Sequence, residues 1–145
     1  MSGICLDIDS EISNVPLVGM SVRSVCSSLT GEEQAGLVEL AVVEAVTNAI
    51  KHAYRGESGK SVIVRLTVSD EALTIEVIDS GNSIPPIKLK AAEALLDFDS
   101  ENMDAIPTSG MGLGIIQRVA DEFLYENIGG QNVLRMTIYL HQRDL

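Results

Sequence analysis

The spacing of apolar residues changes from a helical period to strict alternation near the middle of the chain. Over residues 32–54 apolar side chains recur every three or four positions, which predicts a long helix of about six turns. A shorter helix is predicted over residues 15–29, and its apolar spacing rests on Leu17, Met20, Val25 and Leu29. Residues 61–69 and 72–78 alternate apolar and polar side chains, which predicts two antiparallel strands joined by a tight turn.

Weaker patterns follow in the second half of the chain. Residues 91–97 predict a short helix, whereas residues 98–110 are polar, contain Pro107 and show no consistent period, which predicts a mobile loop. Helical spacing returns over residues 112–123. Residues 133–140 follow a Gly-Gly turn and predict a final strand.

This order of elements favours an α/β two-layer sandwich with helices on one face of the sheet. A doubly wound parallel sheet would need strands and helices to alternate strictly. No repeat or composition shift divides the sequence, so residues 1–145 are expected to form a single domain. Two helix starts are also predicted: Asn14 as the cap of the first helix, and Thr30 with Glu33 as a capping box on the long one.

Charge and hydropathy limit the classes of partner. The formal net charge of −11 would repel a phosphate backbone, and no basic cluster offsets it, so direct nucleic-acid binding is disfavoured and a protein partner is favoured. No apolar run is long enough for a membrane span, and acidic residues stand near the start where a secretory leader carries Lys or Arg. A soluble, cytoplasmic protein is expected. Cys5 and Cys26 lack metal-site spacing and are expected to be buried free thiols.

The long helix contains two polar residues suited to phosphate chemistry. Within EAVTNAIKHAY, Glu44 and Asn48 are four residues apart, so their side chains share one side of the helix. A carboxylate can accept a proton from an attacking hydroxyl, and an amide oxygen suits Mg²⁺ bound to phosphates. His52 lies one turn further and could contact phosphate or a partner. Alternatively, Glu44 and Asn48 are a solvated helix face and His52 is a surface or capping group.

A second candidate lies where the second strand ends, in VIDSGNSIPP. The apolar run places Asp79 at the mouth of a cleft, and Gly81 permits a turn without a Cβ clash. A buried, ionised Asp79 needs a hydrogen-bond donor, and the exocyclic amine of adenine would supply one. An ordinary Asp-x-Gly turn is the alternative.

A third candidate is the glycine-rich start of a helix, in TSGMGLGIIQRVADEF. Gly110, Gly112 and Gly114 let the backbone approach a triphosphate, and the amino end of a helix favours negative charge. Their spacing matches neither the P-loop nor the dinucleotide-binding fingerprint. A glycine-rich turn that only opens a structural helix remains the alternative.

The three segments, in this order, resemble the ATP-binding superfamily of gyrase, heat-shock protein 90, sensor histidine kinases and mismatch-repair ATPases. Within it, the chain resembles the anti-sigma-factor serine kinases of bacterial partner-switching systems, over nearly its whole length. The matching motifs are EAVTNAIKHAY, the Asp-Ser-Gly turn at residues 79–81, and SGMGLGI with the helix that follows. The resemblance implies a Bergerat-type ATP-binding fold with a mixed, mostly antiparallel sheet.

The resemblance also implies a role for each candidate residue. Glu44 would be the catalytic base, Asn48 the Mg²⁺ ligand and Asp79 the carboxylate that reads adenine, while the three glycines would hinge a lid over the phosphates. The full set of predicted ATP-binding residues is Asn48, His52, Asp79, Gly81, Thr108, Ser109, Gly110, Met111, Gly112, Leu113 and Gly114.

By resemblance, the protein would use Mg·ATP to phosphorylate a serine of a small anti-anti-sigma partner of the STAS type. It would hold a sigma factor when that partner is phosphorylated, and it would form a homodimer. The alternatives are a non-catalytic ATP-sensing module and a detached histidine-kinase ATPase domain.

Two positions depart from the family pattern. Ser83 replaces the second glycine of Asp-x-Gly-x-Gly. The threonine that relatives place beside adenine on the last strand is not identified, since that region reads Gln131-Asn132-Val133.

Overall fold

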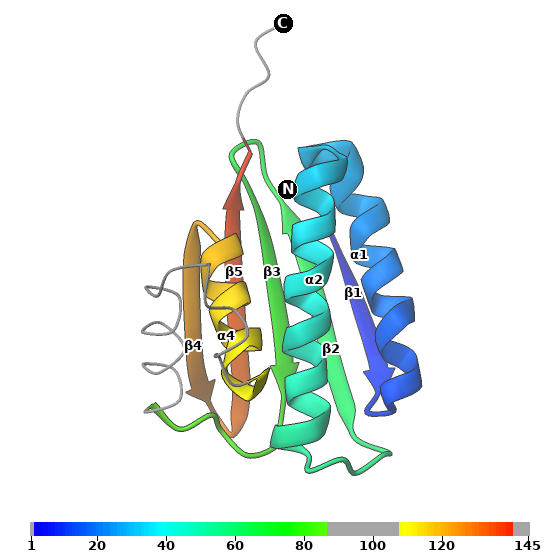
Figure 1. Ribbon diagram of the computed structural model, residues 1–145, viewed down its shortest axis with the longest axis vertical. Helices are drawn as coiled ribbons and strands as arrows, with labels where there is room; N and C mark the ends of the chain where they lie inside the picture. The colour runs from blue at the N-terminus through cyan, green and yellow to red at the C-terminus, as the bar shows by residue number, and fades with distance from the viewer. Residues whose placement is uncertain (1, 87–107, 141–145) are drawn as a thin grey trace, which may run out of the picture.

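The computed structural model describes residues 2–86 and 108–140, and it shows a layer of helices over one face of a β-sheet (Figure 1). The strands are β1 (Ser2–Asp9), β2 (Ser61–Val68), β3 (Ala72–Asp79), β4 (Glu122–Ile128) and β5 (Gln131–Tyr139). The helices are α1 (Val15–Thr30), α2 (Glu32–Asn48) and α4 (Thr108–Val119), with a 3-10 turn η1 (Ile12–Asn14) and a π turn η2 (Ala49–Ala53). The predicted two-layer α/β sandwich is confirmed.

The five strands lie in the order β1-β2-β3-β5-β4. A mixed, mostly antiparallel sheet was expected, and every pairing within residues 2–86 and 108–140 is antiparallel. The predicted strands over residues 61–69 and 72–78 are confirmed as β2 and β3, and the predicted last strand is confirmed within β5. β1 and β4, the two edge strands, were not predicted from the sequence.

The long predicted helix is confirmed, but its last turn has a different geometry. α2 ends at Asn48, and the π turn η2 continues it to Ala53. The capping box is wrong: Gly31, in the left-handed region at φ 89°, occupies the N-cap position, and the Thr30 hydroxyl instead donates to Cys26 O at 3.0 Å. A hydroxyl bonded one turn back along α1 cannot also cap α2.

Two other predicted helix details need correction. Asn14 stands at the N-cap position of α1, but its side chain donates to Asp9 O at 2.9 Å and caps nothing. α4 ends at Val119, not residue 123, because the chain turns at Asp121, whose backbone N–H donates to Thr137 O of β5. No helix among the described residues is both long and apolar enough to cross a bilayer.

The stretch between β3 and α4 is described only at its ends. The predicted helix over residues 91–97 and most of the loop over residues 98–110 lie outside the described residues. Residues 108–110 were assigned to that loop, and they instead form the first turn of α4.

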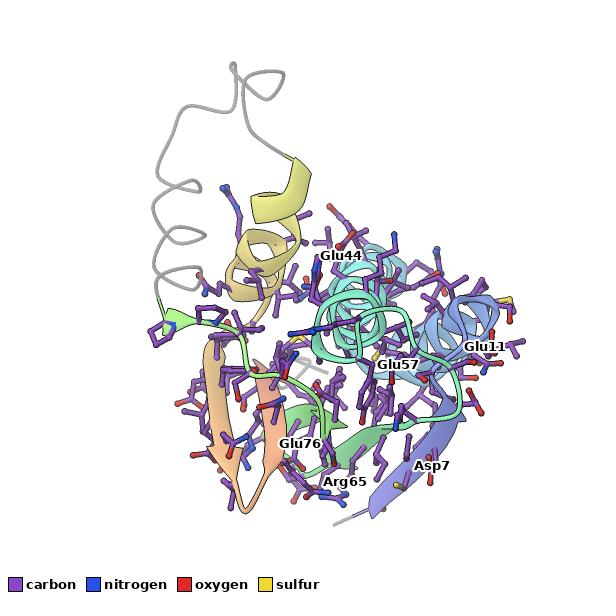
Figure 2. The ribbon with its side chains drawn as sticks, turned by 90° about the horizontal axis from the view of Figure 1, so that it is seen from below. Asp7, Glu11, Glu44, Glu57, Arg65 and Glu76 are labelled. Atoms are coloured by element: carbon purple, nitrogen blue, oxygen red, sulfur yellow. The ribbon has the colours of Figure 1, made fainter. Side chains whose placement is uncertain are left out.

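A row of charged side chains crosses the sheet face that carries no helices, and Figure 2 shows Arg65 and Glu76 of that row. Arg65, Glu76 and Arg135 stand side by side on β2, β3 and β5. Glu76 accepts from Arg135 Nη2 at 3.0 Å and forms an ion pair with Arg65 Nη1 at 3.5 Å. These three charged residues keep the middle of this face polar, and the core lies on the opposite face.

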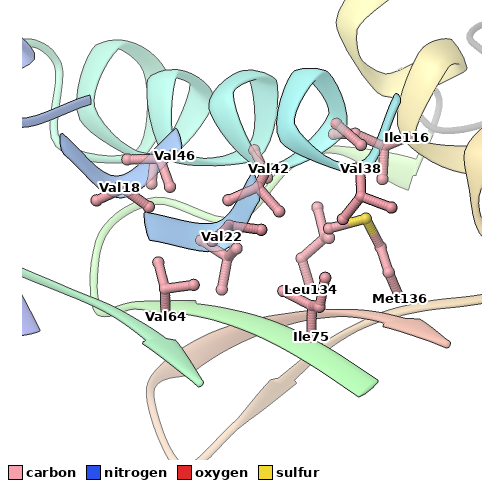
Figure 3. Packing of buried hydrophobic residues seen from close by; sticks show 14 of the residues in the cluster. Val18, Val22, Val38, Val42, Val46, Val64, Ile75, Ile116, Leu134 and Met136 are labelled. Atoms are coloured by element: carbon pink, nitrogen blue, oxygen red, sulfur yellow. The ribbon is translucent and has the colours of Figure 1, made fainter. Parts of the chain in front are cut away.

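The core lies between the sheet and α1 and α2, and it is built largely of valine (Figure 3). Buried side chains include Val18 and Val22 of α1, Val38, Val42 and Val46 of α2, and Val64, Ile75, Leu134 and Met136 of the sheet. Small β-branched side chains let the two helices approach the sheet closely. The spacing predicted for α1 is half right, since Val25 and Leu29 pack against this core, whereas Leu17 and Met20 are 57% and 59% exposed.

The two cysteines differ in environment. Cys26 is buried in this core, as expected. Cys5 is exposed on β1, so the prediction of two buried thiols is half wrong. Cys5 pairs in register with Arg65, whose side chain lies on the charged face of the sheet.

Candidate functional site

The Glu44 carboxylate lies directly against the first half of α4. A Cβ added to Gly112 would stand 2.6 Å from Glu44 Oε2, so only glycine allows this approach without movement. Figure 2 shows Glu44 on α2 beside α4. The fold therefore brings together two of the predicted segments, the acid–amide helix and the glycine-rich helix.

Asn48 and His52 follow Glu44 along the same helical segment. Asn48 is half-buried and ends α2 one α-helical turn after Glu44, which keeps both side chains on one side of the helix. His52 is exposed within the π turn, where the wider turn shifts it out of the α-helical spacing shared by Glu44 and Asn48. Its role in ATP binding remains a prediction.

Asp79 is the last residue of β3 and is 8% exposed. Its Oδ1 accepts two hydrogen bonds, from the Gly81 backbone N–H at 2.9 Å and from Asn132 Nδ2 at 2.8 Å. No hydrogen bond within the described residues reaches Oδ2. Burial raises the pKa of Asp79, and the two hydrogen bonds partly offset that rise.

The turn after Asp79 is fixed to the end of the α2–η2 segment. A Cβ at Gly81 would overlap the carbonyl of Ala53, which confirms that this turn requires glycine, and the Asn82 N–H donates to the same carbonyl at 2.9 Å. The Tyr54 hydroxyl accepts from Ser80 N at 2.7 Å and donates to Ser61 O at 2.7 Å. One helical segment thus contacts the glycine-rich helix at Glu44 and the Asp-x-Gly turn at Ala53.

The residues of the glycine-rich segment differ in their positions along α4 and therefore in their roles. Because α4 begins at Thr108, the N–H groups of the predicted residues Thr108, Ser109 and Gly110 have no partner within the helix. Those amides and the helix dipole can bind an anion. Gly112 provides the close approach to Glu44, Gly114 is buried, and Leu113 belongs to the core.

Asn132 is a site residue that the sequence did not identify. It lies directly across from Asp79 in the β3–β5 register, and it is 1% exposed. Its carboxamide oxygen accepts from the Ser83 hydroxyl at 2.6 Å, which places both departures from the family pattern in one cluster. The only signal in the sequence was that residues 83 and 131–133 both depart from the family pattern. Without the pairing of β3 with β5, nothing in the sequence shows that these two departures are close in space.

A cavity of about 670 Å³ adjoins the same turn. It is lined by residues 80–82 together with Arg55 and Lys60 of the connection between η2 and β2. Glu44, Asn48 and Asp79 do not line it. The cavity therefore contains none of the three polar side chains on which the predicted site rests.

A magnesium ion could be held at Asn48 only with help from the nucleotide. Within the part of the chain that the structure describes, no three His, Cys, Asp or Glu side chains gather as a metal site. Mg²⁺ commonly takes one or two protein oxygens and completes its shell with phosphates and water. A single amide oxygen, one helical turn from the Glu44 carboxylate that lies against α4, fits that pattern.

Comparisons with known proteins identify the family of this chain. The model of the histidine kinase-like ATPase domain family matches residues 8–138. The anti-sigma F factor of Caldanaerobacter subterraneus is 38% identical over 109 residues, which are 74% of this chain and 72% of that protein. The serine-protein kinase RsbW of Bacillus pumilus is 34% identical over 140 residues, which are 94% of this chain and 85% of that protein.

Solved structures agree in fold. A structure of RsbU and RsbW domains from Mycobacterium tuberculosis has a TM-score of 0.66 and 17% identity, and the match covers 97% of this chain and 33% of that one. The mycobacterial sensor histidine kinase MprB has a TM-score of 0.54 and 19% identity, over 94% of this chain and 99% of that one. The chain belongs to the histidine kinase-like ATPase domain family, and within that family to the anti-sigma-factor serine kinases.

Proposed function

We propose that this protein is a Mg·ATP-dependent kinase that phosphorylates a serine of a small anti-anti-sigma partner of the STAS type. It holds a sigma factor when that partner is phosphorylated, and it works as a cytoplasmic homodimer. The observation that carries the proposal is the contact between the Glu44 carboxylate and Gly112 at the phosphate-binding end of α4. The names of its relatives, an anti-sigma F factor and serine-protein kinases, support the same activity.

The base of the nucleotide is read at Asp79. Oδ1 is occupied by two protein donors, which leaves Oδ2 as the acceptor for the exocyclic amine of adenine. The carboxylate must be ionised to accept that hydrogen bond at full strength. A base with a carbonyl in place of this amine would bring its oxygen against Asp79 Oδ2, and two acceptors cannot form a hydrogen bond.

The phosphates lie further back along the same helical segment, near Glu44 in the last third of α2. Glu44 and Ala53 are nine positions apart, roughly 13 Å along a helix at 1.5 Å per residue, so one helical segment can extend along both the base and the phosphates. The backbone amides of residues 108–110 and the dipole of α4 attract the negative phosphates. Mg²⁺, when bound through Asn48, would neutralise part of their charge.

Glu44 is the group placed to accept a proton. The partner's serine hydroxyl attacks the terminal phosphorus, and the Glu44 carboxylate takes its proton as the bond to the leaving ADP oxygen breaks. The transfer requires mostly positioning, which α2 and α4 supply from two sides. A purely ATP-sensing module would not need a carboxylate at this point.

The proposal is tested by incubating the purified protein with [γ-³²P]ATP and STAS-domain proteins of the same organism, with Mg²⁺ and with EDTA. We expect label on a partner serine that depends on Mg²⁺. Tight ATP binding without transfer to any partner would favour the ATP-sensing module. Label on a histidine of a partner would favour a detached histidine-kinase domain.

A further inference from the structure

Asn132 uses the whole hydrogen-bonding capacity of its side chain within the protein. Nδ2 faces three acceptors: Asp79 Oδ1 at 2.8 Å, Gly81 O at 3.0 Å and Asn82 O at 3.3 Å. None of these oxygens can donate, so the amide nitrogen and not the oxygen must face them. The orientation of the carboxamide is therefore fixed by its surroundings.

The carboxamide oxygen of Asn132 also has its hydrogen bonds satisfied within the protein. Oδ1 accepts from Ser83 Oγ at 2.6 Å and from Asn127 Nδ2 at 3.0 Å. Two donors fill the two lone pairs of an amide oxygen, and two hydrogens cover the acceptors on the nitrogen side. Asn132 thus has no group left for a ligand, and any effect it has on a nucleotide must pass through Asp79.

Among the described residues, the Asp79 carboxylate has its only hydrogen bond from another strand from Asn132. The other bond to Oδ1 comes from Gly81, two residues further along the same turn, and it constrains the carboxylate only locally. The bond from Asn132 crosses from β5 to β3 at a directly paired position. Ser83 and Asn127 hold the donor in place from the side opposite Asp79.

We infer that Asn132, held by Ser83 and Asn127, is the positioning residue that directs the Asp79 carboxylate and thereby sets selectivity for a base with an exocyclic amine. The inference rests on the proposed nucleotide site. Ser83 then has a role that glycine could not fill, because its hydroxyl makes the shortest hydrogen bond to the carboxamide, at 2.6 Å. Positions 83 and 132 act as one unit.

The test compares ATP and GTP binding, by calorimetry, for the full-length protein and its Asn132→Leu variant. Leucine keeps the approximate volume but removes the donor. We expect ATP to bind about 10- to 100-fold more weakly, the loss expected for one hydrogen bond to a charged group, and the preference for ATP over GTP to shrink. The phosphotransfer rate at saturating ATP should stay unchanged, because Glu44 and α4 are untouched. Asn82→Leu is the matched control, since only backbone groups of that exposed residue are used.

The pH dependence separates positioning from a merely structural role. Loss of the Asn132 bond removes an interaction that holds the pKa of Asp79 down, so the acid loss of ATP binding should move to higher pH. The titratable side chains around this carboxylate in the described residues are Tyr125 on β4 and Tyr54 after η2. Tyrosine hydroxyls are neutral throughout the acid range, so they cannot produce that shift.

A second variant keeps the inference testable if Asn132→Leu fails to fold. Ser83→Ala combined with Asn127→Ala leaves Asn132 in place but removes both donors to its oxygen, and we expect the same changes about 2- to 10-fold in size. ATP-selective binding by the wild type with no change in either variant would overturn the inference and leave the proposed function intact. Failure of the wild type to prefer ATP would instead contradict the proposed nucleotide site.

Discussion

At the scale of single residues, Asp79 combines burial with one oxygen that no described residue uses. Burial raises its pKa, so the ionised form that accepts the adenine amine is lost on acidification at a higher pH than for an ordinary aspartate. We expect ATP affinity to fall as the pH drops through that raised pKa. Asp79→Asn should bind ATP about 10- to 100-fold more weakly at neutral pH and lose this acid dependence. Calorimetric titrations across the acid range measure both, and an unchanged affinity and pH profile would contradict the role of Asp79.

The two thiols offer a residue-scale test of the fold itself. Burial raises the pKa of Cys26 from 9.0 to about 11, while Cys5 is exposed on an edge strand. Since the thiolate is the reactive form, an alkylating reagent should modify Cys5 in the native protein and Cys26 only after unfolding. Mass spectrometry of the labelled peptides shows which of the two cysteines is modified first. Rapid modification of Cys26 in the folded protein would show that α1 does not pack as described.

At the scale of elements, the contact between α2 and α4 makes Gly112 a test of the kinase geometry. Gly112→Ala would press a methyl group against Glu44 Oε2, which must move. A displacement of about 1 Å can lower a reaction rate by about 100-fold, so phosphotransfer should fall steeply while the free energy of unfolding changes little. The matched control is Gly36→Ala in α2, where the nearest atom to the new Cβ is Arg23 Nη1 at 4.0 Å. The control should keep full activity and gain up to about 1 kcal/mol from helix propensity. Equal activity of both variants would show that the contact is unimportant.

The elements also show what sequence patterns can and cannot predict. α2, β2 and β3 are central, so their buried faces leave a clear apolar period. β1 and β4 lie at the two edges of the sheet, and β1 in particular is mostly exposed, so burial leaves little periodic signal. In α1 the prediction included Val25 and Leu29, which pack against the core, but also exposed Leu17 and Met20, because their apolar character is the same as that of buried residues.

The residues of the candidate site also differ in whether the sequence alone can predict them. Glu44, Asp79 and the glycine-rich segment each lie in a local motif, and local motifs can be read from the sequence. Asn132 joins Asp79 only through the pairing of β3 with β5, at a separation of 53 residues. No local pattern predicts such a contact, and only the strand register makes Ser83 and Asn132 one cluster.

At the scale of the whole molecule, the two faces of the sheet have different tasks. The face without helices carries the Arg65–Glu76–Arg135 ladder, whose partly exposed ion pairs contribute about 1 kcal/mol or less each but keep the middle of that face polar. The other face holds the valine-rich core under α1 and α2, with α4 packed beside α2. The site residues Glu44, Asn48 and Asp79 therefore belong to the helical side of the molecule, where burial can shift a pKa and a helix end can meet phosphate.

Phosphotransfer by the Glu44→Gln variant decides whether this geometry is that of a kinase. Glutamine keeps the shape of the side chain and its contact with Gly112 but cannot accept the proton. With [γ-³²P]ATP and a STAS-domain partner in a single turnover, the variant should bind ATP as the wild type does but transfer phosphate about 100- to 10,000-fold more slowly. Transfer at the wild-type rate would contradict Glu44 as the base. A wild type that binds ATP and labels no serine would contradict the kinase itself.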